Sequence, residues 1–204
     1  MGRCAHEHRY DGSWPPPDAT GASPSDRGMV AGVAGGATGD DRVVLETERL
    51  LLRPWRVEEA SVQRELWIER DPRVPPHRRI DADGHPTLAE LEEAIRADEP
   101  SSLQLLAVEL KAGGDPIGYC GLVQGAHGPE LAFELLRRSW GQGYATEASW
   151  AVLDRARSAG HERLWASVWD WNTASRRVLA KAGFMETARE KTVHGTNLVM
   201  TRPL

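Results

Sequence analysis

A turn with two glycines, placed between an apolar segment and a helix-forming segment, constrains this chain more than any other feature. Residues 130–135 show the alternation typical of a strand, and residues 146–159 carry the small apolar stripe of a packed helix. Gly141 and Gly143 lie between them. Glycine lets a backbone approach a ligand, and the first turn of a helix offers N–H groups without acceptors. The segment therefore predicts a strand, a tight turn and a helix start suited to binding phosphate.

The spacing of this turn excludes two common nucleotide-binding motifs. A P-loop requires Gly-Lys-Ser/Thr, which does not follow Gly143, and a dinucleotide fingerprint requires a third glycine where Ala145 and Thr146 stand. Two glycines alone are a weak signal. A tight turn without a ligand therefore stays open as the alternative interpretation.

Charge and composition limit the possible partners. The chain has 204 residues and a net charge of −5, which argues against broad nucleic-acid binding. No stretch approaches the roughly 20 apolar residues of a membrane span. Cys4 and Cys120 are the only cysteines, so no disulfide framework is predicted, and Cys120 is expected to be a buried strand residue. We expect a cytoplasmic protein that binds neither nucleic acid nor membrane.

The composition also divides the chain into two parts. Residues 1–41 are rich in Pro, Gly and Ser and contain too little apolar surface to offset the entropy of ordering. We predict a disordered tail over 1–41 and a folded domain over 42–204. Translation starting at Met1 or at Met29 remains open.

Within the domain, strands and helices are expected in an α/β (α+β) order. Residues 130–136 and 164–168 predict two parallel strands, because a helix connects them. The other strands predict a mixed, mostly antiparallel sheet. Those strands are expected at 45–53, at 103–110 and 117–123 as a hairpin, and twice within 185–203. The other helices are expected at 57–69, from a Thr87–Glu90 capping box onward, and at 172–182.

Four segments together resemble the GNAT superfamily of N-acetyltransferases, and within it the ribosomal-protein N-terminal acetyltransferase-like (Rim-type) branch. These segments are residues 47–53, 130–135, 140–148 and 172–184, and the resemblance covers about 43–204. It implies the acyl-CoA N-acyltransferase fold, a twisted mixed sheet whose parallel strand pair splays apart between flanking helices. It also implies direct transfer of an acetyl group from acetyl-CoA, as cosubstrate, to a primary amine in a ternary complex. The amine belongs to a protein N-terminus or a small molecule, and the protein is a monomer or a homodimer.

The resemblance also implies where acetyl-CoA binds. The turn would hold the pyrophosphate through backbone N–H groups, and the splayed strand with the Asn172 side chain would hold the pantetheine arm. In the wider superfamily a polar residue stands where this chain has Trp140. The residues expected to bind acetyl-CoA are Leu135, Leu136, Gly141, Gln142, Gly143, Tyr144, Ala145, Thr146 and Asn172.

Catalysis requires a neutral amine, so a base must take its proton. Glu134 is the first candidate, while Glu130, four residues earlier on the same strand face, and a bound water are the alternatives. Many superfamily members protonate the leaving thiolate with a tyrosine at the position of Leu179. Ser175, one helical turn after Asn172, is expected to serve instead.

The missing tyrosine also supports a different class of function, an acyl-CoA-binding sensor or interaction module that has lost catalysis. Ser175 and Glu134 argue against that interpretation. The histidines show no metal-ligand spacing, so no metal is expected. No motif identifies the amine acceptor.

Overall fold

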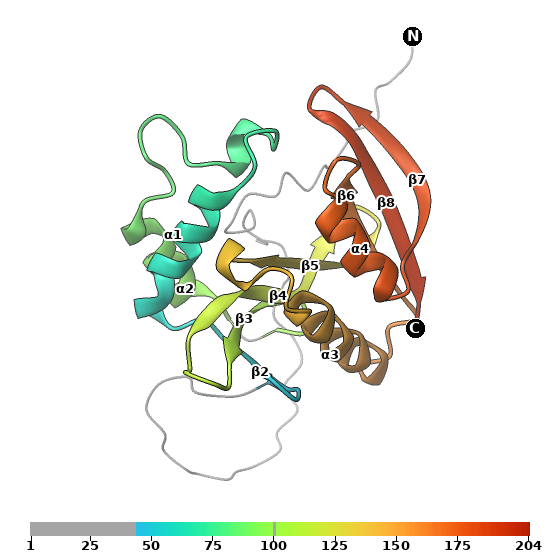
Figure 1. Cartoon of the computed structure of the whole chain (residues 1–204), viewed down its shortest axis with the longest axis horizontal. Helices are drawn as coiled ribbons and strands as arrows, with labels where there is room; N and C mark the ends of the chain where they lie inside the picture. The colour runs from blue at the N-terminus through green and yellow to red at the C-terminus, as the bar shows by residue number, and fades with distance from the viewer. Residues whose placement is uncertain (1–43, 100) are drawn as a thin grey trace, which may run out of the picture.

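A single sheet of eight strands runs through the computed structural model, which describes residues 44–99 and 101–204. The strands follow the order β1-β2-β3-β4-β5-β6-β8-β7, and only β5 and β6 are parallel (Figure 1). The strands are β1 (Leu45–Glu46), β2 (Leu50–Arg53), β3 (Leu105–Leu110), β4 (Pro116–Gly125), β5 (Gly128–Leu135), β6 (Arg163–Trp169), β7 (Met185–Thr192) and β8 (Gly195–Pro203). The predicted disorder of residues 1–41 lies outside the described residues.

Four α-helices and three short 3₁₀ helices connect the described strands. The α-helices are α1 (Ala60–Glu69), α2 (Leu88–Ala97), α3 (Tyr144–Ser158) and α4 (Thr173–Lys181), and the 3₁₀ helices are η1 (Val57–Glu59), η2 (Pro76–Arg78) and η3 (Arg137–Ser139). No helix in the described part of the chain combines the length and the apolar character needed to cross a membrane.

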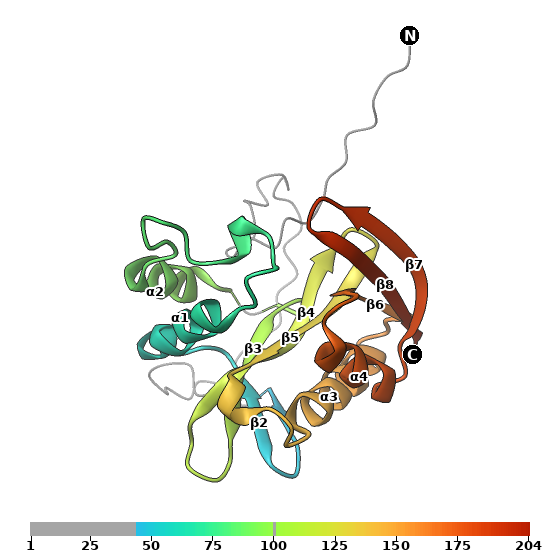
Figure 2. The same cartoon turned by 45° about the horizontal axis from the view of Figure 1, so that its top comes forward.

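The helices cover the two faces of the sheet in pairs (Figure 2). On one face, Val152 of α3 and Leu179 of α4 pack with Leu131 of β5 in the larger core. On the other face, Leu66 of α1 and Leu91 of α2 form a smaller core, against which Tyr119 of β4 packs. Successive residues of a strand point to opposite faces, so in β3 Leu106 belongs to the larger core and Ala107 to the smaller. The predicted fold class is confirmed.

The antiparallel hairpin expected near residues 103–123 is present as β3 and β4. Leu106 is paired with Cys120, whose side chain is fully buried. Burial raises the pKa of the Cys120 thiol to about 12, so the thiol is protonated at neutral pH. The prediction of a buried strand cysteine is confirmed.

The first strand differs from its prediction. One strand was expected over 45–53, but the segment folds into a β1–β2 hairpin in which Leu45 is paired with Leu52. The Thr47 N–H donates to the Leu50 carbonyl at 3.0 Å, and the Leu50 N–H donates to Thr47 Oγ1 at 3.0 Å. Glu147 of α3 also accepts a hydrogen bond from Thr47 Oγ1 at 2.6 Å. This partner is 100 residues away, so no local sequence signal indicates the turn.

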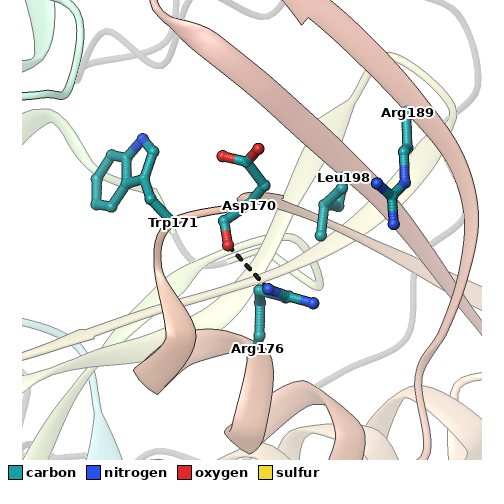
Figure 3. Close-up of a pocket in the computed structure, with 5 residues that line it drawn as sticks. All are labelled: Asp170, Trp171, Arg176, Arg189 and Leu198. Atoms are coloured by element: carbon teal, nitrogen blue, oxygen red, sulfur yellow. Dashed lines mark hydrogen bonds between the residues drawn. The ribbon is translucent and has the colours of Figure 1, made fainter.

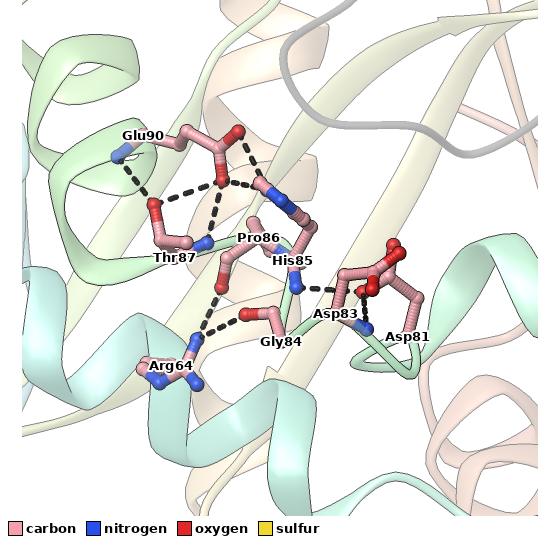
Figure 4. A network of polar contacts seen from close by, with 8 residues as sticks. All are labelled: Arg64, Asp81, Asp83, Gly84, His85, Pro86, Thr87 and Glu90. Atoms are coloured by element: carbon pink, nitrogen blue, oxygen red, sulfur yellow. Dashed lines mark hydrogen bonds and ion pairs between the residues drawn. The ribbon is translucent and has the colours of Figure 1, made fainter.

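The start of α2 agrees with its prediction (Figure 4). The Glu90 N–H donates to Thr87 Oγ1 at 3.3 Å, and the Thr87 N–H donates to Glu90 Oε2 at 2.6 Å, which completes the capping box. His85 Nδ1 lies 2.7 Å from the same carboxylate oxygen. Arg64 of α1 donates to the carbonyls of Gly84 and Pro86 and so ties the loop before α2 to α1.

The parallel pair at the centre of the sheet is short. β5 and β6 share one register pair, Glu130 with Trp165, whereas β6 is paired with β8 from Arg163 to Trp169. Beyond Glu130 the two parallel strands are no longer paired. This junction, in which a single register pair joins the two strands, is called the seam below and agrees with the splayed pair that the resemblance implied.

Candidate active site

The two-glycine turn leads directly into α3. Gly141 and Gly143 have φ angles of 76° and 84°, which L-residues with a side chain rarely adopt. Gly143 is the N-cap residue, and a Cβ added at Gly141 would meet no atom within 4 Å. Five successive backbone N–H groups, those of Gly141, Gln142, Gly143, Tyr144 and Ala145, donate no hydrogen bond to any residue in 44–99 or 101–204. The turn therefore offers an open set of donors at the positive end of a helix dipole.

Glu147, in the first turn of α3, fastens the β1–β2 turn to this helix start. Its Oε1 accepts from the Arg49 N–H at 2.9 Å, and its Oε2 accepts from Arg49 Nε at 2.7 Å. Burial raises the pKa of Glu147, but the hydrogen bonds from Thr47 and Arg49 outweigh burial and lower it. The carboxylate is therefore ionised at neutral pH.

Arg49 extends this contact to the turn itself. Its Nη1 donates to the Gln142 carbonyl at 3.0 Å, and its guanidinium lies 4.6 Å from the centre of the Tyr144 ring. The carbonyl of Gln142 is thus held by a cation while the neighbouring N–H groups stay unpaired. Arg49 and Glu147 fix the conformation of the turn.

Asn172 and Ser175 lie together at the start of α4. The Asn172 side-chain oxygen accepts from the Ser175 N–H at 3.1 Å, so Asn172 is the N-cap of this helix. Ser175 Oγ makes no hydrogen bond within the described part of the chain. Leu179 is 2% exposed and lies in the larger core, so its position contributes no polar group.

The backbone at the end of β5 is already partly used. Trp140 Nε1 donates to the Leu135 carbonyl at 2.6 Å, and the Leu136 N–H donates to the Ile117 carbonyl at 2.8 Å. Both leucines are buried, Leu135 in the larger core and Leu136 in the smaller. These contacts remove one acceptor and one donor from the backbone expected to meet a pantetheine arm.

Glu134 lies on the sheet face covered by α1 and α2, where Arg70 and Tyr119 hold it. Arg70 Nη2 donates to Glu134 Oε2 at 2.8 Å, and Arg70 Nε lies 3.1 Å from both carboxylate oxygens. The Tyr119 hydroxyl donates to Oε2 at 3.0 Å from the directly opposite position of β4. Burial and the charge of Glu134 raise the pKa of the Tyr119 phenol. Sequence reasoning missed this cluster, because Arg70 is 64 residues from Glu134 and is flanked by no motif.

Glu130 faces the same side at the seam. Its Oε1 accepts from the Ser167 N–H of β6 at 2.9 Å, and its Oε2 lies in the space left by the missing side chain of Gly125. Burial raises the pKa of Glu130, although the Ser167 hydrogen bond and the charges of Arg78 and His127 oppose this shift. Among the described residues, Glu130 is not ion-paired with an arginine or a lysine.

Predicted site residues thus come from both faces of the sheet. The turn, Asn172 and Ser175 belong to α3 and α4 on one face, whereas Glu130 and Glu134 point to the other face. The two faces of the sheet are open to each other at the seam, since β5 and β6 are unpaired beyond Glu130.

A hollow of about 350 Å³ lies between the β6–α4 connection and β7–β8 (Figure 3). It is lined by Asp170, Trp171, Arg176, Arg189 and Leu198. Arg176 Nη1 donates to the Asp170 carbonyl at 2.9 Å. The Trp171 ring stacks on Trp169 and lies 4.1 Å from the Arg73 guanidinium, so the segment after α1 reaches across to the β6–α4 connection. Among the described residues, no group of three or more His, Cys, Asp or Glu side chains is arranged to hold a metal ion.

Comparison with known proteins gives one consistent result. Residues 49–185 match the family profile described as "Acetyltransferase (GNAT) domain". An "Uncharacterized N-acetyltransferase p20" from Bacillus licheniformis is 29% identical over 150 residues, which are 70% of this chain and 82% of the relative.

Solved structures agree with this match. A GNAT-family acetyltransferase from Bacillus anthracis has a TM-score of 0.64 at 20% identity and covers 78% of this chain and 97% of its own. Mycobacterium smegmatis RimJ, solved in complex with CoA-disulfide, has a TM-score of 0.56 at 23% identity and covers 76% of this chain and 81% of its own. At these identities the structures show a shared fold.

Proposed function

The chain belongs to the GNAT acetyltransferase family, and on that premise we propose that it transfers an acetyl group from acetyl-CoA directly to a primary amine. The observation that carries the proposal is the set of five N–H groups from Gly141 to Ala145, at the start of α3, for which no described residue is an acceptor. Such donors suit a pyrophosphate, and the parted strands leave room for an extended arm. The acceptor is the α-amine of a protein or the amine of a small molecule.

The donor-binding residues follow from this geometry. The N–H groups of Gly141 to Ala145 and the first turn of α3 at Thr146 hold the phosphates. The Asn172 amide nitrogen remains for the pantetheine arm, because the Asn172 oxygen caps α4. Leu135 and Leu136 contribute apolar surface and the backbone groups that Trp140 and Ile117 leave free. Acetyl-CoA supplies the activated acetyl thioester.

Two side chains of this protein then take part in proton transfer, one at the amine and one at the sulfur. Glu130 accepts the proton of the attacking amine, since it is half-buried at the seam and its pKa is raised. Glu134 has both oxygens engaged by Arg70 and Tyr119, and its role is to hold Arg70 in place. Ser175 Oγ, which has no partner among the described residues, donates to the departing sulfur. The N–C bond forms as the C–S bond breaks, without an acyl-enzyme.

One observation favours a second candidate, an acyl-CoA-binding sensor of the same fold. Leu179 is buried where many superfamily members have an acidic tyrosine, so the supply of a proton to the sulfur depends on Ser175 or water. A sensor would bind acetyl-CoA and transfer nothing.

Two measurements on the purified full chain test the proposal. Calorimetry should detect saturable acetyl-CoA binding, and mass spectrometry of an amine and peptide library incubated with acetyl-CoA should detect products heavier by one acetyl group. Absence of binding contradicts both candidates. Binding without any product supports the sensor and overturns the enzyme.

A further inference from the structure

Arg78, at the end of η2, is a half-buried cation whose side chain has no partner in the part of the chain that the structure describes. Its Nε is buried and makes no hydrogen bond, and no carboxylate of residues 44–99 or 101–204 forms an ion pair with its guanidinium. A buried charged donor left unpaired costs free energy, so a site that keeps one has use for a ligand. Two nearby arginines differ from Arg78, because Arg70 is paired with Glu134 and Arg73 with Asp71.

The position of Arg78 is fixed by the same cluster that holds Glu134. Its N–H donates to the Pro75 carbonyl at 2.9 Å in η2, and its carbonyl accepts from Arg70 Nη1 at 3.0 Å. Arg70 therefore connects the Glu134 carboxylate of β5 with the backbone of Arg78. These contacts hold the backbone of Arg78 and limit the positions that its guanidinium can take when it meets an anion.

Arg78 lies on the same sheet face as Glu130, because Arg70 bonds both the Arg78 carbonyl and Glu134, which points to the same side of β5 as Glu130. Its charge is close enough to lower the pKa values of both Glu130 and Tyr119, against the larger effect of burial, which raises them. Arg78 and Glu130 nevertheless form no ion pair with each other. A carboxylate and a guanidinium held apart in this way can bind the two ends of a zwitterion, with the ammonium at Glu130 and an anion at Arg78.

We propose that the acceptor is a small amine that carries a carboxylate beside the amine, an α-amino acid, and that Arg78 binds this carboxylate while Glu130 meets the amine. This inference rests on the proposed acetyl transfer and narrows its acceptor. Arg78 is then the specificity-determining residue, and simple amines or amidated compounds are poor acceptors.

The test compares free α-amino acids with their amides, which keep the amine and lose the carboxylate charge. For the wild-type protein we expect kcat/KM at least ~30-fold higher for the free acids, as expected for a charge-assisted contact. Arg78→Gln should lower kcat/KM for the free acids by roughly 10–100-fold, mainly through KM, and leave the amides unchanged.

Arg79→Gln is the matched control. Arg79 is adjacent, its Nε is also buried without a partner, and it lines a separate hollow of about 540 Å³ beside Trp67 and Leu91. This variant should leave both classes of acceptor unaffected. Calorimetric binding of the free amino acids in the presence of CoA, lost in Arg78→Gln and kept in Arg79→Gln, gives a readout independent of turnover.

Three outcomes would overturn the inference. Equal use of amides and free acids by the wild type, or the same loss in Arg79→Gln as in Arg78→Gln, removes the role of Arg78 and leaves acetyl transfer intact. Acetylation confined to peptides, whose first carboxyl group is an amide, does the same. Failure to acetylate any amine despite acetyl-CoA binding overturns the proposed function itself.

Discussion

Arg70 forms an ion pair with Glu134, with Nη2 2.8 Å from Oε2 and Nε 3.1 Å from each oxygen of the carboxylate. Arg70 also stacks on Trp67 at 4.0 Å and donates to the Arg78 carbonyl. One ion pair thus joins β5, α1 and η2. We therefore propose that Glu134 has a structural role and that Glu130, four residues earlier, is the carboxylate that takes part in proton transfer.

Glu130→Gln should lower kcat by about 10²–10⁴-fold, because glutamine cannot take a proton. Its side-chain oxygen can still accept from the Ser167 N–H, so the seam is preserved. In the wild type, kcat/KM should rise with pH through the pKa of Glu130, which burial raises above its ordinary value despite Arg78 and His127. The acidic limb of the pH–rate profile should disappear in Glu130→Gln and persist in Glu134→Gln. The reverse pattern would make Glu134 the base.

Stability provides a control for this pair of variants. A carboxylate whose pKa is raised by folding weakens the fold at pH values above the folded pKa and has no such effect below the unfolded pKa. Glu130→Gln should therefore be neutral or stabilising at pH 8. Glu134→Gln should destabilise by about 1–3 kcal/mol, since it leaves the buried Arg70 without its charged partner. Denaturant titrations at pH 8 measure both.

Gly141→Asp should weaken acetyl-CoA binding by at least ~30-fold in calorimetry, because a carboxylate would stand among the N–H groups that hold the phosphates. Gly160→Asp is the matched control at the other end of α3. Gly160 has a φ of 85° and, like Gly141, open space around its Cα, so both variants carry the same backbone strain. Equal losses of affinity would remove the turn from the binding site.

Glu147→Gln should loosen the turn before α3 and reduce acetyl-CoA affinity by about fivefold, the equivalent of about 1 kcal/mol. The hydrogen bonds of Thr47 and Arg49 hold the pKa of Glu147 below its ordinary value. Its stabilising effect is therefore complete above the unfolded pKa and is lost as pH falls through the folded pKa. The variant should melt below the wild type at pH 7 and match it in strong acid. Asp154→Asn, which changes an exposed ion pair of the same helix, should alter neither property.

Arg53→Ala should destabilise the protein by ~3–5 kcal/mol, the usual cost of removing one partner from a buried ion pair. The Arg53 side chain is 2% exposed and lies 2.5 Å from Glu59 Oε1 and 2.6 Å from Glu109 Oε2. Arg138→Ala removes the exposed pair with Glu65 and should change stability by less than ~1 kcal/mol. Similar costs for both variants, measured by denaturant titration, would contradict the difference in burial.

Local features of the fold could be predicted from the sequence. The Thr87–Glu90 capping box, the β3–β4 hairpin and the helix after Gly143 all depend on residues within a few positions of one another. Strand alternation correctly put Glu130 and Glu134 on one face. The resemblance to known acetyltransferases supplied the splayed strands, which spacing alone would not have indicated.

The features that the sequence did not predict depend on contacts between residues far apart along the chain. The turn that divides residues 45–53 is bonded to Glu147, and the carboxylate of Glu134 is held by Arg70. Arg78 carries no signal in the sequence, because no motif near it indicates a partner. Only the fold shows which charges are paired and which are left over.

The seam has a mechanical consequence. A single parallel rung joins a five-stranded half, β1 to β5, to a three-stranded half formed by β6, β8 and β7. When the sheet is pulled across its strands, the single Glu130–Trp165 pairing should break before the longer β4–β5 and β6–β8 pairings on either side. A molecule bound along the gap would hold the two parts of the sheet together. The two parts should therefore resist separation most strongly when the gap is occupied.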